Sequence, residues 1–354
     1  MKVLWLLGVL NYGGAEVRTL QLFKAIHKID NLKLYLYVNS GEKGDLSEEF
    51  EKLNIEIIYA KKGLIGFLNL IQILRNEKIN VFHCNANLAG GLFCFLAYLA
   101  GVKKRISHIR TSEDYGSGIL YRFKKFFYTG VLNIFSNNII GVSKSCLQLS
   151  SFNKDKYQTI YNGFLFKEII KNKINNKKEA NLICLGRMHP AKNQLFLVDI
   201  LYELNKRFPN IEWRLGFYGK EDLIIKSQIQ AEAEKKNIIH YISFNGKTDD
   251  PIQAIEKYDI LLLPSIREGL PGVLLEAASI NVPSVCSTLS GCVEIAEIVD
   301  SVTPISLDSK DEWIETIYQI FINDKKINND YLKNTDFNFD NHRINILKLW
   351  GVIK

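Results

Sequence analysis

Short apolar runs alternate with amphipathic stretches along the first half of the chain. Continuous apolar runs predict buried strands, and apolar residues at every third or fourth position predict helices. This pattern predicts strands over Val3–Leu10, Leu32–Val38, Ile55–Tyr59, Val81–His83, Arg105–Ile109 and Asn138–Val142, and helices over Ala15–Ile29, Leu64–Asn76 and Leu88–Ala100. Strands that alternate with helices indicate a parallel sheet covered on both faces.

The same order of elements begins again after a polar segment, Lys167–Lys178, which is rich in Lys and Asn and typical of a linker. The pattern then predicts strands over Asn181–Leu185, Trp213–Tyr218, Ile239–Ser243, Ile260–Pro264 and Ser284–Cys286, and helices over Asn193–Lys206, Leu223–Lys236, Ile252–Lys257 and Gly272–Ile280. The sequence therefore predicts an α/β fold with two Rossmann-like domains, over residues 1–166 and 179–334. We expect residues 335–354 to form a helix that packs back on the first domain.

Composition narrows the class of protein. The chain has 45 Lys and Arg against 38 Asp and Glu, and its net charge of +7 favours an anionic ligand or an anionic membrane surface. No basic stripe with interleaved aromatic residues repeats along the chain, so we do not expect nucleic acid as a partner. The six cysteines form no CxxC pair, which fits buried thiols in a reducing cytoplasm. We expect a buried first strand at the N-terminus rather than a signal peptide.

Two strand-to-helix turns are candidates for phosphate binding. The first contains Gly13 and Gly14, which allow close approach of a phosphate to the backbone at a helix N-terminus. A tight turn without a ligand explains these glycines equally well. The second turn, Gly186–Asn193, carries Arg187 and Lys192, two cations suited to holding a diphosphate and stabilising it as it leaves. A solvated basic loop is an equally good interpretation of this segment by itself.

The most specific motif runs from Ser265 to Glu276, directly after an apolar strand. Seven residues separate Glu268 from Glu276, so one carboxylate lies on a loop and the other about one turn into a helix. Carboxylates accept hydrogen bonds from sugar and ribose hydroxyls. Glu276 has the alternative of being an exposed helix charge, but its neighbours are apolar, and a carboxylate among apolar residues needs a partner.

These motifs resemble those of the family 4 retaining glycosyltransferases, whose GT-B fold has two Rossmann-like domains facing across a cleft. The resemblance spans nearly the whole chain and is most specific at Glu268–Glu276 and at Gly186, Arg187 and Lys192. It implies that Arg187 and Lys192 bind the donor diphosphate and that Glu276 binds the ribose. It further implies donor contacts from the following residues: Gly13, Gly14, Asn162, Glu268, Gly269, Leu270 and Pro271.

The chain departs from this family where many members carry a histidine near the reacting sugar. The segment here reads Ser107–Thr111, so either His108 takes this role from a shifted position or Arg110 replaces it. We favour His108 as a catalytic residue, together with Glu268, Arg187 and Lys192. A buried histidine at the end of a strand is the alternative, and His83 is more simply explained as a core residue.

The resemblance implies a retaining glycosyltransferase that takes a sugar from a nucleotide diphosphate sugar, with uridine as the favoured base. The implied acceptor is a glycan or a lipid-linked sugar in bacterial surface polysaccharide synthesis. No two Asp residues stand two positions apart, so we expect no DxD metal site and no cofactor. Two alternatives remain, a nucleotide-sugar epimerase of the same fold and a non-catalytic subunit that binds nucleotide or glycan.

A further segment, Tyr121–Tyr128, mixes cations with aromatic residues in a predicted helix. Such a helix can lie in a bilayer interface, which predicts a cytoplasmic protein attached peripherally to the inner face of the cell membrane. The alternative is that the Phe residues face the core while Arg122, Lys124 and Lys125 face solvent.

Overall fold

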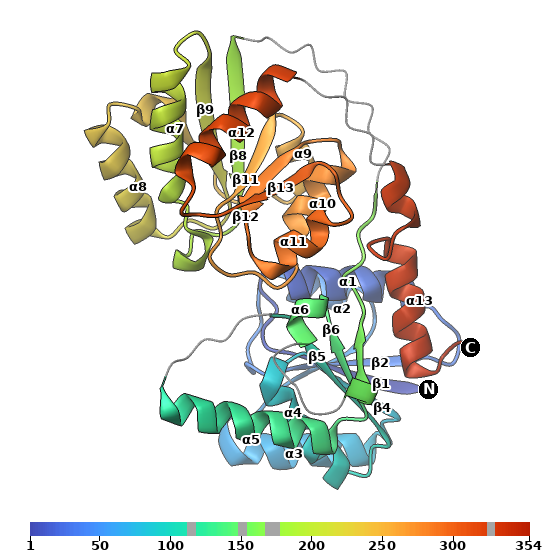
Figure 1. Ribbon diagram of the computed structural model, residues 1–354. Coiled ribbons are helices and arrows are strands. Elements are labelled where there is room, and N and C mark those ends of the chain that lie inside the picture. Colours follow the sequence, from blue (N-terminus) through green and yellow to red (C-terminus); the bar gives the residue numbers. More distant parts are fainter. Residues whose placement is uncertain (112–117, 148–153, 167–177, 324–329) are drawn as a thin grey trace. The chain divides into compact units, whose positions relative to one another are not determined.

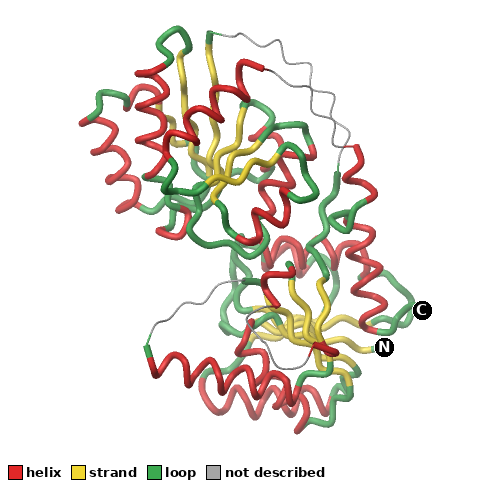
Figure 2. The backbone as a smooth tube through the Cα atoms, in the orientation of Figure 1, coloured by secondary structure: helices red, strands yellow, loops and turns green. Residues whose placement is uncertain are grey.

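The computed structural model describes residues 1–111, 118–147, 154–166, 178–323 and 330–354. The chain divides into two compact units (Figure 1). The first unit comprises Met1–Gly163 and Asp336–Lys354, and the second comprises Phe164–Thr335. Each is built on a parallel sheet with helices on its faces, which confirms the predicted α/β fold (Figure 2). Apart from Lys178, the predicted linker lies outside the described residues.

The first unit contains a seven-stranded sheet in the order β3-β2-β1-β4-β5-β6-β7. Its strands are β1 (Lys2–Leu7), β2 (Lys33–Val38), β3 (Glu56–Tyr59), β4 (Val81–Cys84), β5 (Lys104–Ile109), β6 (Asn138–Gly141) and β7 (Tyr157–Thr159). Its helices are α1 (Gly14–Ile26), α2 (Ser47–Glu51), α3 (Gly63–Asn76), α4 (Gly90–Leu99), α5 (Ile119–Phe135), α6 (Lys144–Leu147) and α13 (Phe339–Trp350). The strand order reverses direction between β1 and β4.

Both faces of this sheet are buried, which is why its strands are continuous apolar runs. Side chains of β1 alternate between two cores, with Trp5 in one and Leu4 in the other. The C-terminal helix α13 contributes Ile346 and Trp350 to the core that contains Trp5. Helix α4 contributes Cys94 to the opposite core.

The second unit contains a six-stranded sheet in the order β10-β9-β8-β11-β12-β13. Its strands are β8 (Glu179–Leu185), β9 (Glu212–Tyr218), β10 (Ile242–Phe244), β11 (Ile260–Leu263), β12 (Ser284–Ser287) and β13 (Val302–Ile305). Its helices are α7 (Phe196–Arg207), α8 (Leu223–Lys235), α9 (Pro251–Ile255), α10 (Gly272–Ser279), α11 (Ser290–Ala296) and α12 (Lys310–Asn323). Here the order reverses between β8 and β11.

Several predicted element ends are wrong for local reasons. The helix expected from Asn193 begins only at Phe196, because Asn193 adopts a left-handed conformation with φ of 51° after a short 3₁₀ turn. The strand expected from Ile239 begins only at Ile242, because a 3₁₀ turn precedes it. The first strand ends at Leu7 rather than Leu10.

Candidate active site

The two loops that follow β8 and β11 meet at the carboxyl edge of the second sheet. The strand order reverses between these two strands, and open α/β sheets bind their ligands at the carboxyl ends of the strands where such a reversal occurs. The backbone N–H of Ile266 donates to the carbonyl oxygen of Ala191 at 2.9 Å, which fastens one loop to the other. The predicted motifs around Lys192 and Glu268 therefore belong to one site.

Lys192 and Glu268 form an ion pair at this junction. Lys192 Nζ lies 2.5 Å from Glu268 Oε1, and Ser265 Oγ donates to the same oxygen at 2.8 Å. The two side chains are only 25% and 12% exposed, so the pair is screened little by solvent. An ammonium group has three donors, so a lysine held in place by this carboxylate can still bind an anion.

The loop that carries Arg187 is shaped by close backbone packing. The side chain of Gln194 donates to the Arg187 carbonyl oxygen at 3.1 Å, while the Arg187 side chain is exposed. Below the loop, Gly219 has a φ of 137°, and a Cβ at this position would lie 2.3 Å from the Gly186 oxygen. Only glycine fits there, because the backbone conformation and the contact both exclude a side chain.

The loop after β11 leads into α10 and is supported by the loop after β12. Leu270 and Pro271 are buried, and Pro271 stands at the N-cap of α10 without a side-chain cap. Glu276 is half-buried on α10. A Cβ on Gly291 would lie 1.9 Å from the Gly269 oxygen, so Gly291 allows α11 to press against this loop. Ser287 also donates to the carbonyl oxygen of Ser265.

Thiols near the ion pair are neutral. Burial raises the pKa of Cys184 to about 12, although Lys192 acts in the opposite direction. The pKa of Cys292 is raised well above its usual value, first by a hydrogen bond with Cys286 and then by burial. A neutral buried thiol is a poor nucleophile, so the charged groups of the site are its cations and carboxylates.

In the first unit, the carboxyl edge carries a different group of polar residues, centred on Arg110. Its Nε donates to Asn85 Oδ1 at 2.7 Å, and its Nη1 donates to Asn162 Oδ1 at 3.1 Å. The backbone N–H of Arg110 donates to Asn87 Oδ1 at 2.8 Å. Burial lowers the pKa of Arg110 to about 10, and nearby Glu16 opposes this shift, so the guanidinium remains charged at neutral pH.

The predicted glycine turn lies in this unit at the start of α1. A Cβ on Gly13 would lie 2.4 Å from Glu16 Oε2, so Gly13 lets the Glu16 carboxylate fold back on the turn. Gly14 is exposed, and a Cβ there would meet no atom within 4 Å. Its backbone is therefore accessible from solvent, as a phosphate-approaching glycine requires.

His108 is placed differently from the expectation. Its side chain is 0% exposed, and its Nδ1 lies 3.1 Å from His83 Nε2. Trp350 Nε1 donates to His83 Nδ1 at 3.1 Å. Because indole is only a donor, His83 carries its proton on Nε2 and His108 carries its own on Nε2 as well. Burial holds the pKa of both histidines well below its usual value. The prediction that His108 contacts the reacting sugar does not fit a side chain without exposed surface, and Arg110 is the better candidate.

Sequence reasoning missed the asparagines that hold Arg110 and the serines under the second site. Asn85 and Asn87 follow directly after the buried strand β4. Polar residues at the carboxyl end of such a strand are the signal that was available. The role of Trp350 had no local signal, because it meets His83 from the far end of the chain.

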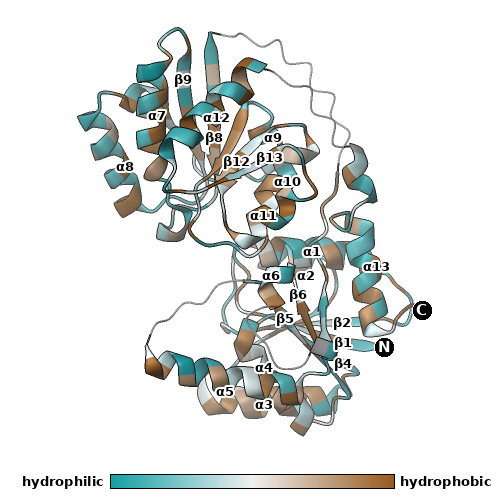
Figure 3. Cartoon of the chain, in the orientation of Figure 1, coloured by the Kyte–Doolittle hydropathy of each residue, from teal (hydrophilic) through white to brown (hydrophobic). Residues whose placement is uncertain are grey.

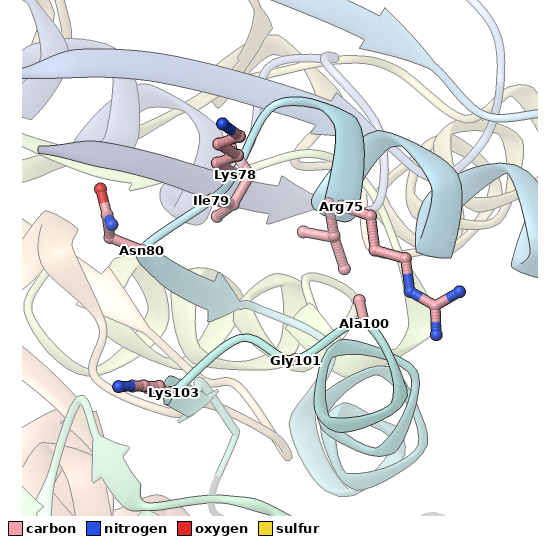
Figure 4. A pocket seen from close by; sticks show the side chains of 8 residues that line it. Arg75, Lys78, Ile79, Asn80, Ala100, Gly101 and Lys103 are labelled. Atoms are coloured by element: carbon pink, nitrogen blue, oxygen red, sulfur yellow. The ribbon is translucent and has the colours of Figure 1, made fainter.

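A depression at the other end of the first unit's helices is not part of these sites (Figure 4). It is lined by Leu74, Arg75, Lys78, Ile79, Asn80, Ala100, Gly101 and Lys103. Arg75 Nη2 donates to the Leu99 carbonyl oxygen at 2.6 Å, which satisfies a helix C-terminus. Helix capping therefore explains the position of Arg75.

In the part of the chain that the structure describes, we find no group of three His, Cys, Asp or Glu side chains that could hold a metal ion. Within the same ranges, no helix has the length and hydrophobicity needed to cross a bilayer.

Comparison with known proteins agrees with this geometry. The family model described as glycosyl transferases group 1 matches residues 179–323. The capsular polysaccharide biosynthesis glycosyltransferase CapH of Staphylococcus aureus is 30% identical over 335 residues, which cover 92% of each chain. An Escherichia coli UDP-Gal:alpha-D-GlcNAc-diphosphoundecaprenol alpha-1,3-galactosyltransferase is 23% identical over 259 residues, 67% of this chain and 64% of that protein. The Anabaena protein HepE, solved with UDP, superposes over 100% of both chains with a TM-score of 0.81 and 16% identity.

The two doubly wound sheets and the structural match show that the chain has the GT-B fold. It belongs to the glycosyl transferases of group 1.

Proposed function

We propose that this enzyme transfers a sugar, with retention of configuration and without a metal ion, from a UDP-sugar to a glycan or lipid-linked sugar in surface polysaccharide synthesis. The observation that carries this proposal is the Lys192–Glu268 pair at the point of reversal of the second sheet, with Arg187 on the same loop as Lys192. A charged group held at this edge suits the diphosphate of a nucleotide sugar.

In the proposed complex, Arg187 and Lys192 bind the donor diphosphate. Glu268 already fixes the direction of the Lys192 ammonium, so little side-chain entropy is lost when the phosphate arrives. Glu276 accepts hydrogen bonds from the ribose hydroxyls. The backbone N–H groups of Gly269 and Leu270, and those at the start of α10, favour the negatively charged diphosphate. Pro271 lies between them and has no N–H to donate.

The proposed reaction takes place on one face of the sugar. The bond from the anomeric carbon to the phosphate oxygen breaks, and a bond from that carbon to the acceptor oxygen forms. The acceptor hydroxyl proton moves to the leaving phosphate. Lys192 and Arg187 stabilise the negative charge that develops on the diphosphate, which is the part a divalent cation plays in other glycosyltransferases.

The proposed acceptor site is the carboxyl edge of the first unit, around Gly14 and Arg110. Arg110 donates hydrogen bonds to the amide oxygens of Asn85 and Asn162, and an edge with such amide and guanidinium groups suits the hydroxyls of a sugar. The E. coli relative is named for a UDP-sugar donor and a lipid-linked acceptor, and HepE was solved with UDP. These names support the choice of uridine and of a lipid-linked acceptor here.

The test is a thermal-shift screen of the purified protein against UDP, GDP, ADP and CMP, followed by the corresponding sugars. We expect selective stabilisation by UDP that is lost in Lys192→Ala and kept in Lys220→Ala, a control on a neighbouring loop. Stabilisation by another diphosphate would correct the base, while no shift with any of them would reject the donor site. Incubation of the UDP-sugar without acceptor separates transfer from epimerisation, which would convert the sugar under that condition.

A further inference from the structure

Helices α3, α4 and α5 of the first unit share an unusual charge pattern. None of the residues from Gly63 to Asn76, from Gly90 to Leu99 or from Ile119 to Phe135 is acidic. Their charged residues are Arg75, Arg122, Lys124 and Lys125. Helices α8 and α12 of the second unit, by contrast, contain both Glu and Lys. The first unit therefore presents a helical layer with cations only.

The same layer exposes large apolar side chains. Twelve of the twenty-three exposed large hydrophobic residues in the described ranges lie on these three helices. In Figure 3 the ribbons of α3 and α5 carry brown stretches, which mark hydrophobic residues. Soluble surfaces rarely gather apolar residues in this way unless a partner covers them.

The first half of α5 is the most exposed part of the layer. Phe123, Phe126 and Phe127 are 68%, 67% and 57% exposed, so the interpretation that these rings face the core is wrong. The buried residues of this helix are Thr129 and Leu132, both in its second half. Gly91 of α4 meets Leu132 closely, so α4 supports the second half of α5.

The exposed apolar residues of α5 lie on one side of the helix. At about 100° per residue, Ile119, Leu120, Phe123, Phe126, Phe127 and Ile134 fall within an arc of about 120°. Thr129 and Leu132 lie on the opposite side. Helix α5 thus has one face for its own unit and a second apolar face directed away from it, as in helices that lie in a membrane interface.

Helix α3 repeats this arrangement on the other flank of α4. Leu64, Ile65 and Leu68, in its first two turns, are 79%, 66% and 63% exposed. Gly66 and Leu70 are buried on its inner side. Phe67 contacts Phe93 of α4 with their ring centroids 6.3 Å apart. Both outer helices therefore expose apolar side chains near their N-terminal ends.

We propose that this layer, defined by the exposed apolar residues and cations of α3 and α5, docks on an anionic lipid bilayer. The apolar side chains enter the interface, and the exposed cations Arg122 and Lys124 at the two borders of the apolar face bind lipid phosphates. Charge decides against a second copy as the occupant, since two such layers would bring cations against cations, and α3, α4 and α5 contain no acidic residue to pair with them. Docking is independent of the donor site, so it can be tested with no sugar present.

The experiment is flotation of the full-length protein with vesicles of phosphatidylcholine alone or mixed in equal parts with phosphatidylglycerol. We expect binding to the mixed vesicles that weakens with added salt, and binding to phosphatidylcholine at least about tenfold weaker. Phe123→Ser with Phe126→Ser, and separately Arg122→Glu with Lys124→Glu, should each reduce binding at least about tenfold.

The matched control is Leu223→Ser with Ile224→Ser, at exposed apolar positions of α8 in the second unit. We expect the control to bind vesicles as the unchanged protein does, and all variants to keep UDP stabilisation. No binding to either vesicle, or equal loss in the control, would overturn the proposal. Equal binding to both vesicles would overturn its anionic component. A dimer in solution that Phe123→Ser with Phe126→Ser disperses would identify a second copy as the occupant instead.

Discussion

The carboxyl edges of the two sheets have the same topology and opposite chemistry. In the second unit, the edge carries the Lys192–Glu268 ion pair and the exposed cation Arg187. In the first unit, the edge carries Arg110 within hydrogen bonds to neutral amide oxygens, above a buried pair of neutral histidines. The fold thus determines where a ligand can bind, and the side chains on each edge determine which charge that ligand can have.

The largest effect that tests this comparison is the loss of one cation from each edge. We expect Lys192→Ala to lower kcat/KM for the donor by about 10²- to 10³-fold, because it removes charge stabilisation of the leaving diphosphate. Arg110→Ala should leave UDP affinity unchanged within about twofold while raising KM for the acceptor. Steady-state kinetics with each substrate varied in turn would measure both.

The comparison would break if Arg110→Ala weakened UDP binding as much as Lys192→Ala does. Lys192→Arg serves as the companion variant, since it keeps the charge but changes its shape. Partial recovery of donor use in that variant is expected if charge rather than packing is the contribution of Lys192.

A smaller effect is expected from Gly291, which packs against the loop that carries Glu268. A Cβ at this position would meet the Gly269 oxygen at 1.9 Å, so Gly291→Ala should displace the loop that carries Glu268. We expect the donor KM to rise about tenfold, with a loss of about 1–3 kcal/mol in the free energy of unfolding. Gly130→Ala is the matched control, because a Cβ there meets nothing within 4 Å. Unchanged donor kinetics in Gly291→Ala would show that the loop does not need this support.

The edge that carries Lys192 and Glu268 was largely predictable from sequence, and the edge that carries Arg110 was not. Arg187, Lys192 and Glu268 stand in short loops directly after apolar strands, so their place at the sheet edge follows from the local pattern. The burial of His108 could not be predicted in the same way, because its side chain contacts His83, and His83 accepts a hydrogen bond from Trp350 at the far end of the chain. The hydrophobic periodicity of a short stretch of sequence carries no information about such long-range contacts. It also could not show whether the Phe rings of α5 are exposed.

The histidines predict a difference between the units in their response to acid. In the first unit, burial holds the pKa of His83 and His108 well below its usual value and lowers that of His342 to about 4. In the unfolded chain these groups take up protons near pH 6.5, so the unfolded state binds more protons below that pH and folding stability falls. We expect the first unit to lose up to about 6 kcal/mol between pH 7 and pH 5.

Amide hydrogen exchange resolved by peptide would measure this loss in each unit separately. His189 and His240 of the second unit are exposed, so its protection should change little over the same range. Equal loss of protection in both units would contradict the assignment of acid sensitivity to the buried histidines. His342→Gln should reduce the pH dependence of the first unit's folding stability, because glutamine takes up no proton in this range.

The smallest expected effect is that of removing divalent cations. If Lys192 and Arg187 supply the positive charge at the donor diphosphate, excess EDTA should leave kcat within about twofold of its value without chelator. The measurement is sharpest in Lys192→Ala, where added Mg²⁺ replaces part of the missing charge if the diphosphate is accessible to the ion. Loss of activity of the unchanged enzyme in EDTA, restored by Mg²⁺, would mean that the charged edge of the second sheet is incomplete without a metal ion. The two edges would then differ in the groups that bind this metal ion, and not in Lys192 and Arg187 alone.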